Sequence, residues 1–406
     1  MSNDNLIYAP FIGVLPSAEY ASEVAAPPYD VLSAQEAKIK ARGKPHSFLH
    51  VSKAEIDFEE SINPYDDRVY QKAAENFKKM LEKGVLYKTD KPCFYVYQMQ
   101  MDKHIQTGLA VAASVKAYNE GRIKRHELTR IAKENDRVKQ IRTVGAQTGP
   151  ALLINKNIPE IKVLLQNIVQ TQKPVFSVVG DYNVRHSLWI IDDDAQIKKI
   201  ALAFDAQNEA YIADGHHRSA AAARLAAEDN TVDSGRFLAV AYFEDEMQIF
   251  DYNRVVFDLN GNTKEEFLQK LQKDFKLTKI EMQKPSKKST FTMYLDNQWY
   301  LLEHIGTPIA DDPVSLLDVS LLSKKVLNDI LGIQDLRNSE RIDFIGGIRG
   351  AQEIKKVVDT HKGSVGFMVY PTAVSELIAV ADKKMLMPPK STWFEPKLAD
   401  GIVSKL

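Results

Sequence analysis

The sequence predicts a mixed α/β protein, with α/β or α+β layers, that is built from two domains. Its 406 residues exceed the usual size of one compact domain. Hydrophobic residues make up 44% of the chain, which is enough for a substantial core. Apolar runs with strand character alternate with helical segments, and this alternation favours mixed layers over a helical bundle or a β-sandwich.

The composition excludes several classes of protein. The 53 Lys and Arg residues balance 54 Asp and Glu residues, which excludes a disordered polyelectrolyte and an overall basic coat for nucleic acid. The single cysteine, Cys93, excludes an internal disulfide framework, a multi-cysteine zinc site and a CxxC redox pair. The first residues show no basic region followed by a long apolar one, and no run of about eighteen apolar residues occurs. We therefore expect a cytoplasmic protein with no membrane partner.

Three helical segments carry their own start or stop signals. Capping boxes are predicted at Ser33–Glu36 and Thr263–Glu266. Apolar residues recur at helical spacing over Asp66–Leu81, and Gly84 can close that helix in the left-handed region. Strands are predicted from β-branched and aromatic runs at Phe94–Gln98, Leu109–Val115, Leu188–Ile191, Tyr211–Ala213, Phe237–Phe243, Phe291–Leu295 and Val365–Tyr370.

A domain boundary is predicted near residue 258. There a polar segment leads into a new amphipathic helix, Lys264–Phe275. We therefore expect domains at residues 1–258 and 259–406, and the C-terminal tail of the second domain could return to the site of the first.

The most informative segment is YIADGHHRSAAAARLAAE, residues 211–228. A short apolar strand runs into the DGHHR loop, and an alanine-rich helix follows at once. Gly215 permits a tight turn, and the first amides and the dipole of the helix favour a phosphate group. Arg218 can add a bidentate contact to that phosphate.

The other residues of the loop support two interpretations. His216 and His217 can donate hydrogen bonds or move protons near neutral pH. Alternatively, Asp214 caps the helix and the histidines satisfy local hydrogen bonds. A zinc site on the two histidines is disfavoured because adjacent residues at a helix start point in different directions and no cysteine is near.

A second segment, RIKRHELTRIAKENDRVKQIR at residues 122–142, holds eight basic and three acidic residues. Its cations could hold polyphosphate oxygens while a carboxylate helps to hold magnesium, although a solvated helix face would look similar. The stretch with an excess of basic residues is short and is interrupted by acidic residues, so it does not indicate strongly that the protein binds nucleic acid. Its charged candidates are His126, Glu127, Arg130, Lys133, Glu134, Asp136 and Arg137.

Three further segments could contribute. The prolines of AAPPYD, residues 25–30, fix a turn that presents Asp30, either as an ordinary helix start or as a carboxylate positioned against a substrate. GGIRG, residues 346–350, is either a phosphate turn or a tight connection. In the tail, Lys390 to Thr392 and Lys397 could contact an anion, while Trp393 and Phe394 favour an anchor.

These motifs together resemble a known family. The series AAPPYDVLS, SFLHVSKAEID, TGLAVAASV, GRIKRHELTR, KENDR, YIADGHHRSAAAAR, YNRVV, GGIRG and MPPKSTWFEPKL is similar to the bacterial and archaeal family known as domain of unknown function one thousand and fifteen. The resemblance runs from about Ala9 to Val403. The DGHHR segment also resembles the GHxR-type phosphate loop of the ParB/sulfiredoxin-like fold, which ParB nucleotide-binding domains, sulfiredoxin and free serine kinases share.

The resemblance implies a ParB/sulfiredoxin-like N-terminal domain with a nucleotide site at residues 215–218. The basic segment is similar to the second nucleotide-contacting motif of ParB, in which Glu134, Asn135 and Arg137 are the best matches. The spacing of these residues departs from the ParB pattern. Glu127 is an alternative to Glu134 as the match for the glutamate of that motif. Sulfiredoxin chemistry is disfavoured, because Asp214 stands where that enzyme has its cysteine.

The resemblance implies a phosphotransferase that would use ATP or ADP with magnesium to modify the hydroxyl of a small metabolite, such as free L-serine. Asp30 or Glu127 would be the base, His217 and Arg218 would stabilise the transferring group, and Glu134 would help to hold the metal. Further nucleotide contacts would come from Asp214, Gly215, His216, His126, Arg130, Lys133 and Arg137. The alternative is a non-catalytic ParB-like nucleotide-binding switch or adaptor.

Overall fold

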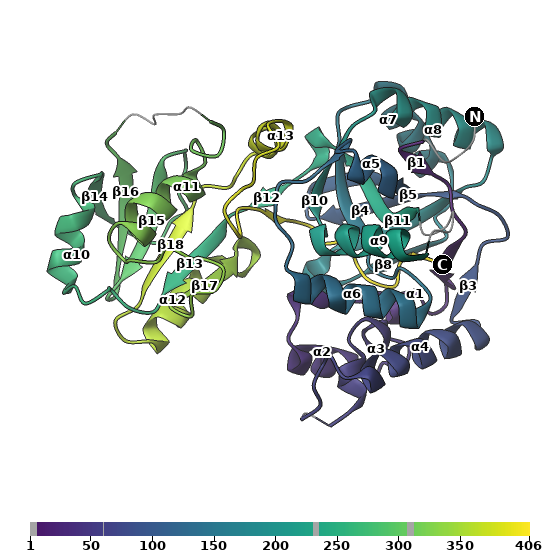
Figure 1. The fold of residues 1–406 in the computed structure, drawn as a ribbon, viewed down its shortest axis with the longest axis horizontal. Helices are drawn as coiled ribbons and strands as arrows, with labels where there is room; N and C mark the ends of the chain where they lie inside the picture. The colour runs from purple at the N-terminus through teal and green to yellow at the C-terminus, as the bar shows by residue number, and fades with distance from the viewer. Residues whose placement is uncertain (1–5, 60, 230–234, 307–311) are drawn as a thin grey trace. The chain divides into compact units, whose positions relative to one another are not determined.

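The computed structural model describes residues 6–59, 61–229, 235–306 and 312–406, and these form a mixed α/β protein with several sheets (Figure 1). The chain divides into two compact units, Met1–Met247 with Pro396–Leu406, and Gln248–Glu395. The division lies at residue 247 instead of the expected 258, because Tyr252–Val256 pairs with strands of the second unit.

The first unit contains a large mixed sheet. Its strands are β1 Tyr8–Ala9, β4 Phe94–Met101, β5 His104–Ser114, β6 Ile123–Lys124, β7 Ala151–Asn155, β8 Phe176–Val179, β9 Arg185–Ile191, β10 Ala210–Asp214 and β11 Arg236–Phe243. Their order is β6-β10-β7-β11-β5-β4-β9-β8, and β1 pairs with β5 beside this path. β10 runs antiparallel to β7 and parallel to β6, so the DGHHR loop leaves the sheet between these two neighbours.

A small second sheet returns the C-terminal tail to the first unit. It has the order β20-β2-β3, with β2 at Gly13–Pro16, β3 at Leu86–Lys88 and β20 at Ser404–Lys405. Backbone hydrogen bonds between Ala26 and Asp400 fix the tail a few residues earlier. The chain therefore passes through the whole second unit before its C-terminal tail returns to the first unit.

The first unit also contains a series of helices. They are α1 Ala21–Val24, α2 Ala34–Ala41, α3 Leu49–Ser52, α4 Asp67–Glu82, α5 Val115–Asn119, α6 Ile131–Val144, α7 Pro159–Thr171, α8 Asp194–Gln207 and α9 His216–Asp229, with short 3-10 turns η2 Tyr29–Val31, η3 Ala54–Asp57, η4 Asp181–Asn183 and η5 Glu244–Glu246. The predicted helix over Asp66–Leu81 is confirmed as α4, and the predicted capping box at Ser33–Glu36 starts α2. Among the described residues, no helix combines the length and the apolar character needed to cross a membrane.

The alanine-rich helix α9 packs closely on the sheet. Ala221 and Ala222 are fully or nearly fully buried, and α9 contacts both β7 and β11. α6 lies beside α9, as Figure 1 shows, and Val138 of α6 packs against Ala221 and Leu225 of α9. Small side chains allow this close approach, so the start of α9 is held rigidly next to the sheet.

The second unit is a six-stranded antiparallel sheet with helices. Its strands are β13 Tyr252–Val256, β14 Phe275–Ile280, β15 Thr290–Leu295, β16 Gln298–His304, β17 Ile342–Gly346 and β18 Val365–Val369, in the order β14-β16-β15-β18-β13-β17. Other elements are β12 Ile249–Phe250, β19 Trp393–Phe394, α10 Lys264–Leu271, α11 Asp318–Leu322, the π-helical η6 Ser323–Asn328, η7 Gly347–Arg349, α12 Gly350–Thr360 and α13 Val374–Asp382. The capping box at Thr263–Glu266 is confirmed, but α10 ends at Leu271 and Phe275 already begins β14.

The tail carboxylate Asp400 makes an unusual contribution to this fold. It is 2% exposed, and its Oδ2 accepts a hydrogen bond of 3.1 Å from the backbone amide of Tyr29. Burial raises the pKa of Asp400 to about 7, although Arg218 acts in the opposite direction. The folded protein therefore holds a proton on Asp400 that the unfolded chain, with a pKa of about 3.9, releases more readily.

We predict that Asp400 makes stability depend on pH. Because its pKa is raised on folding, its stabilising contribution is fully present below about pH 4 and is lost as the pH rises through about 7. The free energy of unfolding of the natural protein, measured against Asp400→Asn by chemical denaturation, should fall by up to about 1.4 kcal/mol per pH unit between about pH 5 and 7. Asp194→Asn, a change at an exposed side chain of α8, is the control and should give a flat difference. A flat difference for Asp400→Asn as well would contradict the prediction.

Candidate functional site

A left-handed glycine turn joins β10 to α9. Gly215 has φ of +89°, and a Cβ atom at this position would lie only 3.0 Å from the Cα of Ala151. The backbone amide of Gly215 donates a hydrogen bond of 2.7 Å to the Asp214 carboxylate. Both the conformation and the close approach require glycine, so the turn brings the chain tightly against β7 before α9 begins.

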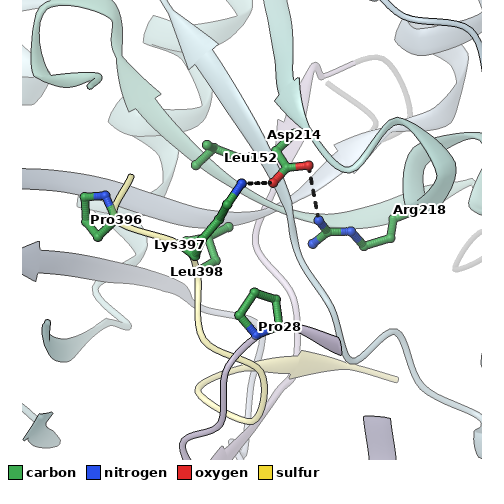
Figure 2. Close-up of a pocket in the computed structure, with 7 residues that line it drawn as sticks. All are labelled: Pro28, Leu152, Asp214, Arg218, Pro396, Lys397 and Leu398. Carbon is green, nitrogen blue, oxygen red and sulfur yellow. Dashed lines mark hydrogen bonds and ion pairs between the residues drawn. The ribbon is translucent and has the colours of Figure 1, made fainter. Parts of the chain in front are cut away.

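Beside this turn lies a small pocket (Figure 2). Its empty volume is about 260 Å³, including space open to solvent. The pocket is lined by residues from four distant segments of the first unit, namely Pro28, Leu152, Asp214, Arg218, Pro396, Lys397 and Leu398.

Two cations flank the carboxylate of Asp214 in the pocket. Figure 2 shows Lys397 on one side and Arg218 on the other. Lys397 Nζ lies 3.0 Å from Asp214 Oδ2, which is both an ion pair and a hydrogen bond. Arg218 Nη2 lies 3.7 Å from Asp214 Oδ1 and 3.6 Å from Asp30 Oδ2, which is ion-pair distance but too long for direct hydrogen bonds.

Arg218 points inward. Its side chain is 11% exposed, and its Nη1 donates a hydrogen bond to the backbone carbonyl of Pro150. Burial opposes its charge, but Asp30 and Asp214 outweigh burial and raise its pKa above the ordinary value. The guanidinium therefore remains charged inside the pocket wall.

The charges of the pocket are nearly compensated. Burial alone would raise the pKa of Asp214, but Lys397 and Arg218 outweigh burial and hold it well below its usual range. Arg218 thus faces the carboxylates of Asp214 and Asp30, Lys397 faces Asp214, and the buried Asp400 interacts electrostatically with Arg218. An incoming polyanion would meet cations already balanced by carboxylates, so it would bind best together with another cation.

The predicted residues of the basic segment lie in the connection between β6 and α6 and in α6 itself, outside the residues that line the pocket. Glu134 accepts a hydrogen bond from Thr129, and one of its oxygens lies 3.5 Å from Arg224. Lys133 is exposed and donates a hydrogen bond of 3.1 Å to the hydroxyl of Tyr65. The side chain of Glu134 is therefore already held by neighbouring residues.

Arg137 and His217 link α6 to the pocket segments. Arg137 forms an ion pair with Asp136 and lies 3.9 Å from the centre of the Tyr29 ring, next to Asp30 in the chain. His217 is half-buried, and its Nε2 accepts a hydrogen bond of 3.0 Å from the backbone amide of Arg130. Burial lowers the pKa of His217, although the charges of Glu134 and Asp30 oppose this. The ring is thus a neutral acceptor that holds the start of α6 against the start of α9.

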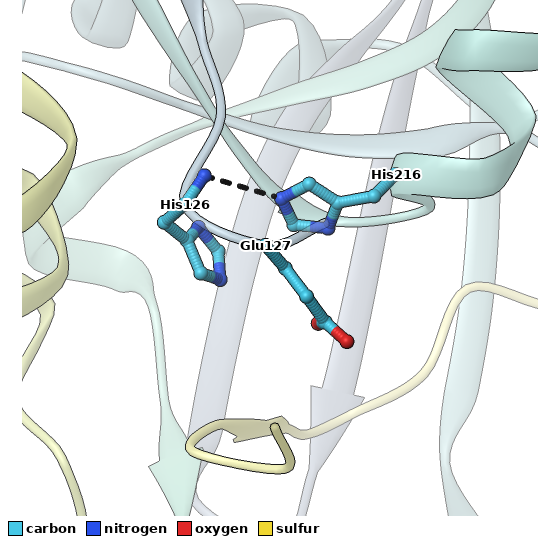
Figure 3. A group of neighbouring side chains, drawn as sticks. All are labelled: His126, Glu127 and His216. Atoms are coloured by element: carbon cyan, nitrogen blue, oxygen red, sulfur yellow. Dashed lines mark hydrogen bonds between the residues drawn. The ribbon is translucent and has the colours of Figure 1, made fainter. Parts of the chain in front are cut away.

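His126, Glu127 and His216 form a separate cluster (Figure 3). The two imidazoles meet edge to face, with ring centres 4.5 Å apart, and the His126 amide donates to His216 Nε2 over 3.5 Å. Burial lowers the pKa of His126 to about 4, while a hydrogen bond with the Ile212 backbone acts the other way. Burial, followed by the neighbouring His126, also lowers the pKa of His216. None of the three residues lines the pocket of Figure 2.

The structure also adds residues that were not among the main sequence candidates. Lys397 stood only among several possible anion contacts of the tail, and nothing in the sequence distinguished it from Lys390, which belongs to the second unit. The sequence did not indicate that Asp400 belongs near the site, because a lone carboxylate near a C-terminus is ordinarily solvated. The first two glycines of GGIRG pack tightly, since a Cβ on Gly347 would lie 2.4 Å from Asp251 Oδ1, and this favours the tight connection.

Comparison with known proteins gives one family match and several distant structural likenesses. No match was found among curated proteins. The chain is similar to a free serine kinase in complex with AMP, with a TM-score of 0.33 and 13% identity over 70% of this chain and 86% of that chain. A free serine kinase variant in complex with ADP gives a TM-score of 0.34 and 14% identity over 70% and 87%. SbnI with a C-terminal truncation, from Staphylococcus aureus, gives 0.38 and 12% over 72% and 85%.

These TM-scores are too low for the likenesses to support a functional conclusion. The family model is a different kind of match, because it covers most of the chain. The model described as protein of unknown function (DUF1015) matches residues 8–320. The chain therefore belongs to the DUF1015 family.

Proposed function

We propose that the pocket holds the phosphates of ATP or ADP with magnesium, and that the chain transfers a phosphoryl group to the hydroxyl of a small metabolite, free L-serine or a similar compound. The single observation that carries this proposal is the position of Arg218 and Lys397 on either side of Asp214, directly at the Gly215 turn. The resemblance of the DGHHR loop to the phosphate loop of ParB and free serine kinases supports the same assignment.

The turn suits a phosphate for two reasons. The left-handed Gly215 turn places the start of α9 directly after β10, so the positive end of a long helix dipole lies at the pocket. Arg218 and Lys397 add two full charges at the same place. The pocket is small, so the base and the ribose of a nucleotide would lie outside the lining described above.

Magnesium follows from the balance of charge. Carboxylate oxygens are the ligands that Mg²⁺ prefers, and Asp214 lines the pocket while Asp30 lies 3.6 Å from Arg218. Magnesium bound there would neutralise charge on the phosphates and spread it more evenly in the transition state. Glu134 could contribute as an additional ligand only by exchanging its contacts with Thr129 and Arg224.

Asp30 is the best candidate for the base. Its side chain is 39% exposed, and its Oδ2 lies 3.6 Å from Arg218, a residue that lines the pocket. In the proposed step the substrate hydroxyl oxygen forms a bond to phosphorus, the bond from phosphorus to the leaving phosphate oxygen breaks, and the hydroxyl proton passes to Asp30. Glu127 is less suitable, because it lies with His126 and His216.

A nucleotide-dependent switch or adaptor is the second candidate. One observation favours it: Arg218 contacts the Pro150 carbonyl, Asp30 and Asp214, so it connects three segments of the first unit. A phosphate that draws Arg218 toward itself would weaken these three contacts. The segments that Arg218 connects could then move relative to one another. Turnover separates the two candidates. Incubation with ATP or ADP, magnesium and a panel of hydroxylated amino acids should give a phosphorylated product, whereas nucleotide binding without product would favour the switch.

We predict that Arg218→Ala weakens nucleotide binding. Loss of one charge-assisted contact should cost about 1.5–3 kcal/mol, or roughly 10- to 150-fold in affinity for ADP with magnesium. Isothermal titration calorimetry measures the change, and circular dichroism checks that the variant is folded. Arg68→Ala is the matched control, because Arg68 pairs with Asp66 at the exposed start of α4. Equal affinity in the Arg218 variant and the natural protein would remove Arg218 from the site.

We predict that Asp30→Asn lowers turnover and leaves nucleotide affinity nearly intact. Asparagine keeps the size of the side chain but cannot accept the hydroxyl proton, so the rate should fall by about 100-fold or more. Product formation measured with saturating nucleotide gives the rate, and calorimetry gives the affinity. Asp67→Asn, a change at a well-exposed side chain of α4, serves as the control. Full activity of the Asp30 variant would place the base elsewhere.

A further inference from the structure

We propose that His126, Glu127 and His216 form a binding site for a first-row transition metal ion, with zinc the best fit, distinct from the magnesium of the phosphate pocket. This site goes beyond the proposed kinase or switch function and does not depend on it. It follows from three observations, namely the convergence of three ligand atoms, a buried nitrogen without a partner, and the chemistry of the donor set.

Two segments that are distant in the sequence bring the ligands together. His126 and Glu127 lie in the connection between β6 and α6, and His216 is the first residue of α9, ninety positions later. Figure 3 shows the two rings beside each other, with the Glu127 side chain next to them. One nitrogen from each ring and one carboxylate oxygen lie within 4.8 Å of one another. The cluster is held in place by the tight Gly215 turn on one side and by β6 on the other.

The second observation is an unsatisfied ring nitrogen. His126 is 2% exposed, and its Nδ1 is buried with no hydrogen-bond partner, while the ring is held by the Ile212 backbone. Buried polar atoms in proteins are nearly always paired, and a lone pair on a buried imidazole is a metal ligand or an acceptor. A backbone partner on one nitrogen and a free lone pair on the other is the usual state of a histidine that binds a metal.

The donor set selects the kind of ion. Two imidazole nitrogens with one carboxylate suit zinc and its first-row neighbours, whereas magnesium prefers oxygen ligands alone. Three protein ligands also leave a fourth position for water. Ligand atoms around tetrahedral zinc lie about 3.4 Å apart, so the present cluster must contract by about 1 Å or somewhat more. Glu127 is only partly buried and can supply that movement with its flexible side chain.

The test uses the full-length chain, stripped with a chelator and titrated with Zn²⁺ and with Co²⁺ in the absence of nucleotide. The natural protein should bind zinc in competition with a chelating dye, and cobalt should give the visible absorption of a tetrahedral nitrogen and oxygen site. Glu127→Gln should weaken zinc binding by at least about tenfold. His126→Gln should weaken it further, and His46→Gln, outside the cluster, should bind like the natural protein.

Folding is separated from ligand loss by the choice of variants. His126 and His216 are buried, so their variants are interpreted only where circular dichroism and the melting temperature without metal match those of the natural protein. Glu127 is partly exposed, so Glu127→Gln keeps the test decisive if both histidine variants misfold. Absence of zinc binding by the natural protein, or equal affinity of the natural protein and Glu127→Gln, would overturn the proposal. Failure of nucleotide binding would leave this result unaffected, because no nucleotide is added.

Discussion

The carboxylate of Asp214 is the interaction on which the candidate site depends. It lies between Arg218, one helical turn further on, and Lys397, which is 183 positions away in the sequence. Loss of this carboxylate would remove the ion pair with Lys397 and leave Arg218 paired with Asp30. Asp214 also accepts the amide of Gly215, so the same side chain shapes the turn and fixes the tail.

Much of the local structure could be predicted from the sequence, because it depends on neighbours in the chain. The face of α4, the capping boxes of α2 and α10 and the strand character of Phe237–Phe243 follow from spacing and side-chain type. The domain boundary and the end of α10 were predicted wrongly, because contacts between residues distant in the sequence determine them. β13 belongs to the second unit because of its partners β17 and β18, and α10 is shorter than its pattern because β14 pairs with β16.

The candidate site shows the same limit. The DGHHR loop was recognisable because a strand, a glycine and a helix follow one another, and its arginine does line a pocket. The sequence could not show that His216 turns away from that pocket to meet His126, or that Lys397 enters it, because adjacent residues on a helix diverge and pairing across the fold leaves no local pattern. The two histidines of the loop thus belong to different environments, one buried beside Glu127 and one tied to Arg130.

The return of Pro396–Leu406 to the first unit has a consequence for how the protein is made. A growing chain can form most of the large sheet and α9 early, but Lys397 and Asp400 emerge from the ribosome only after the whole second unit has been translated. Until then the Asp214 carboxylate lacks its lysine and β2 lacks its partner β20. The pocket is therefore completed at the last stage of biogenesis, so a truncated translation product would carry an unfinished site.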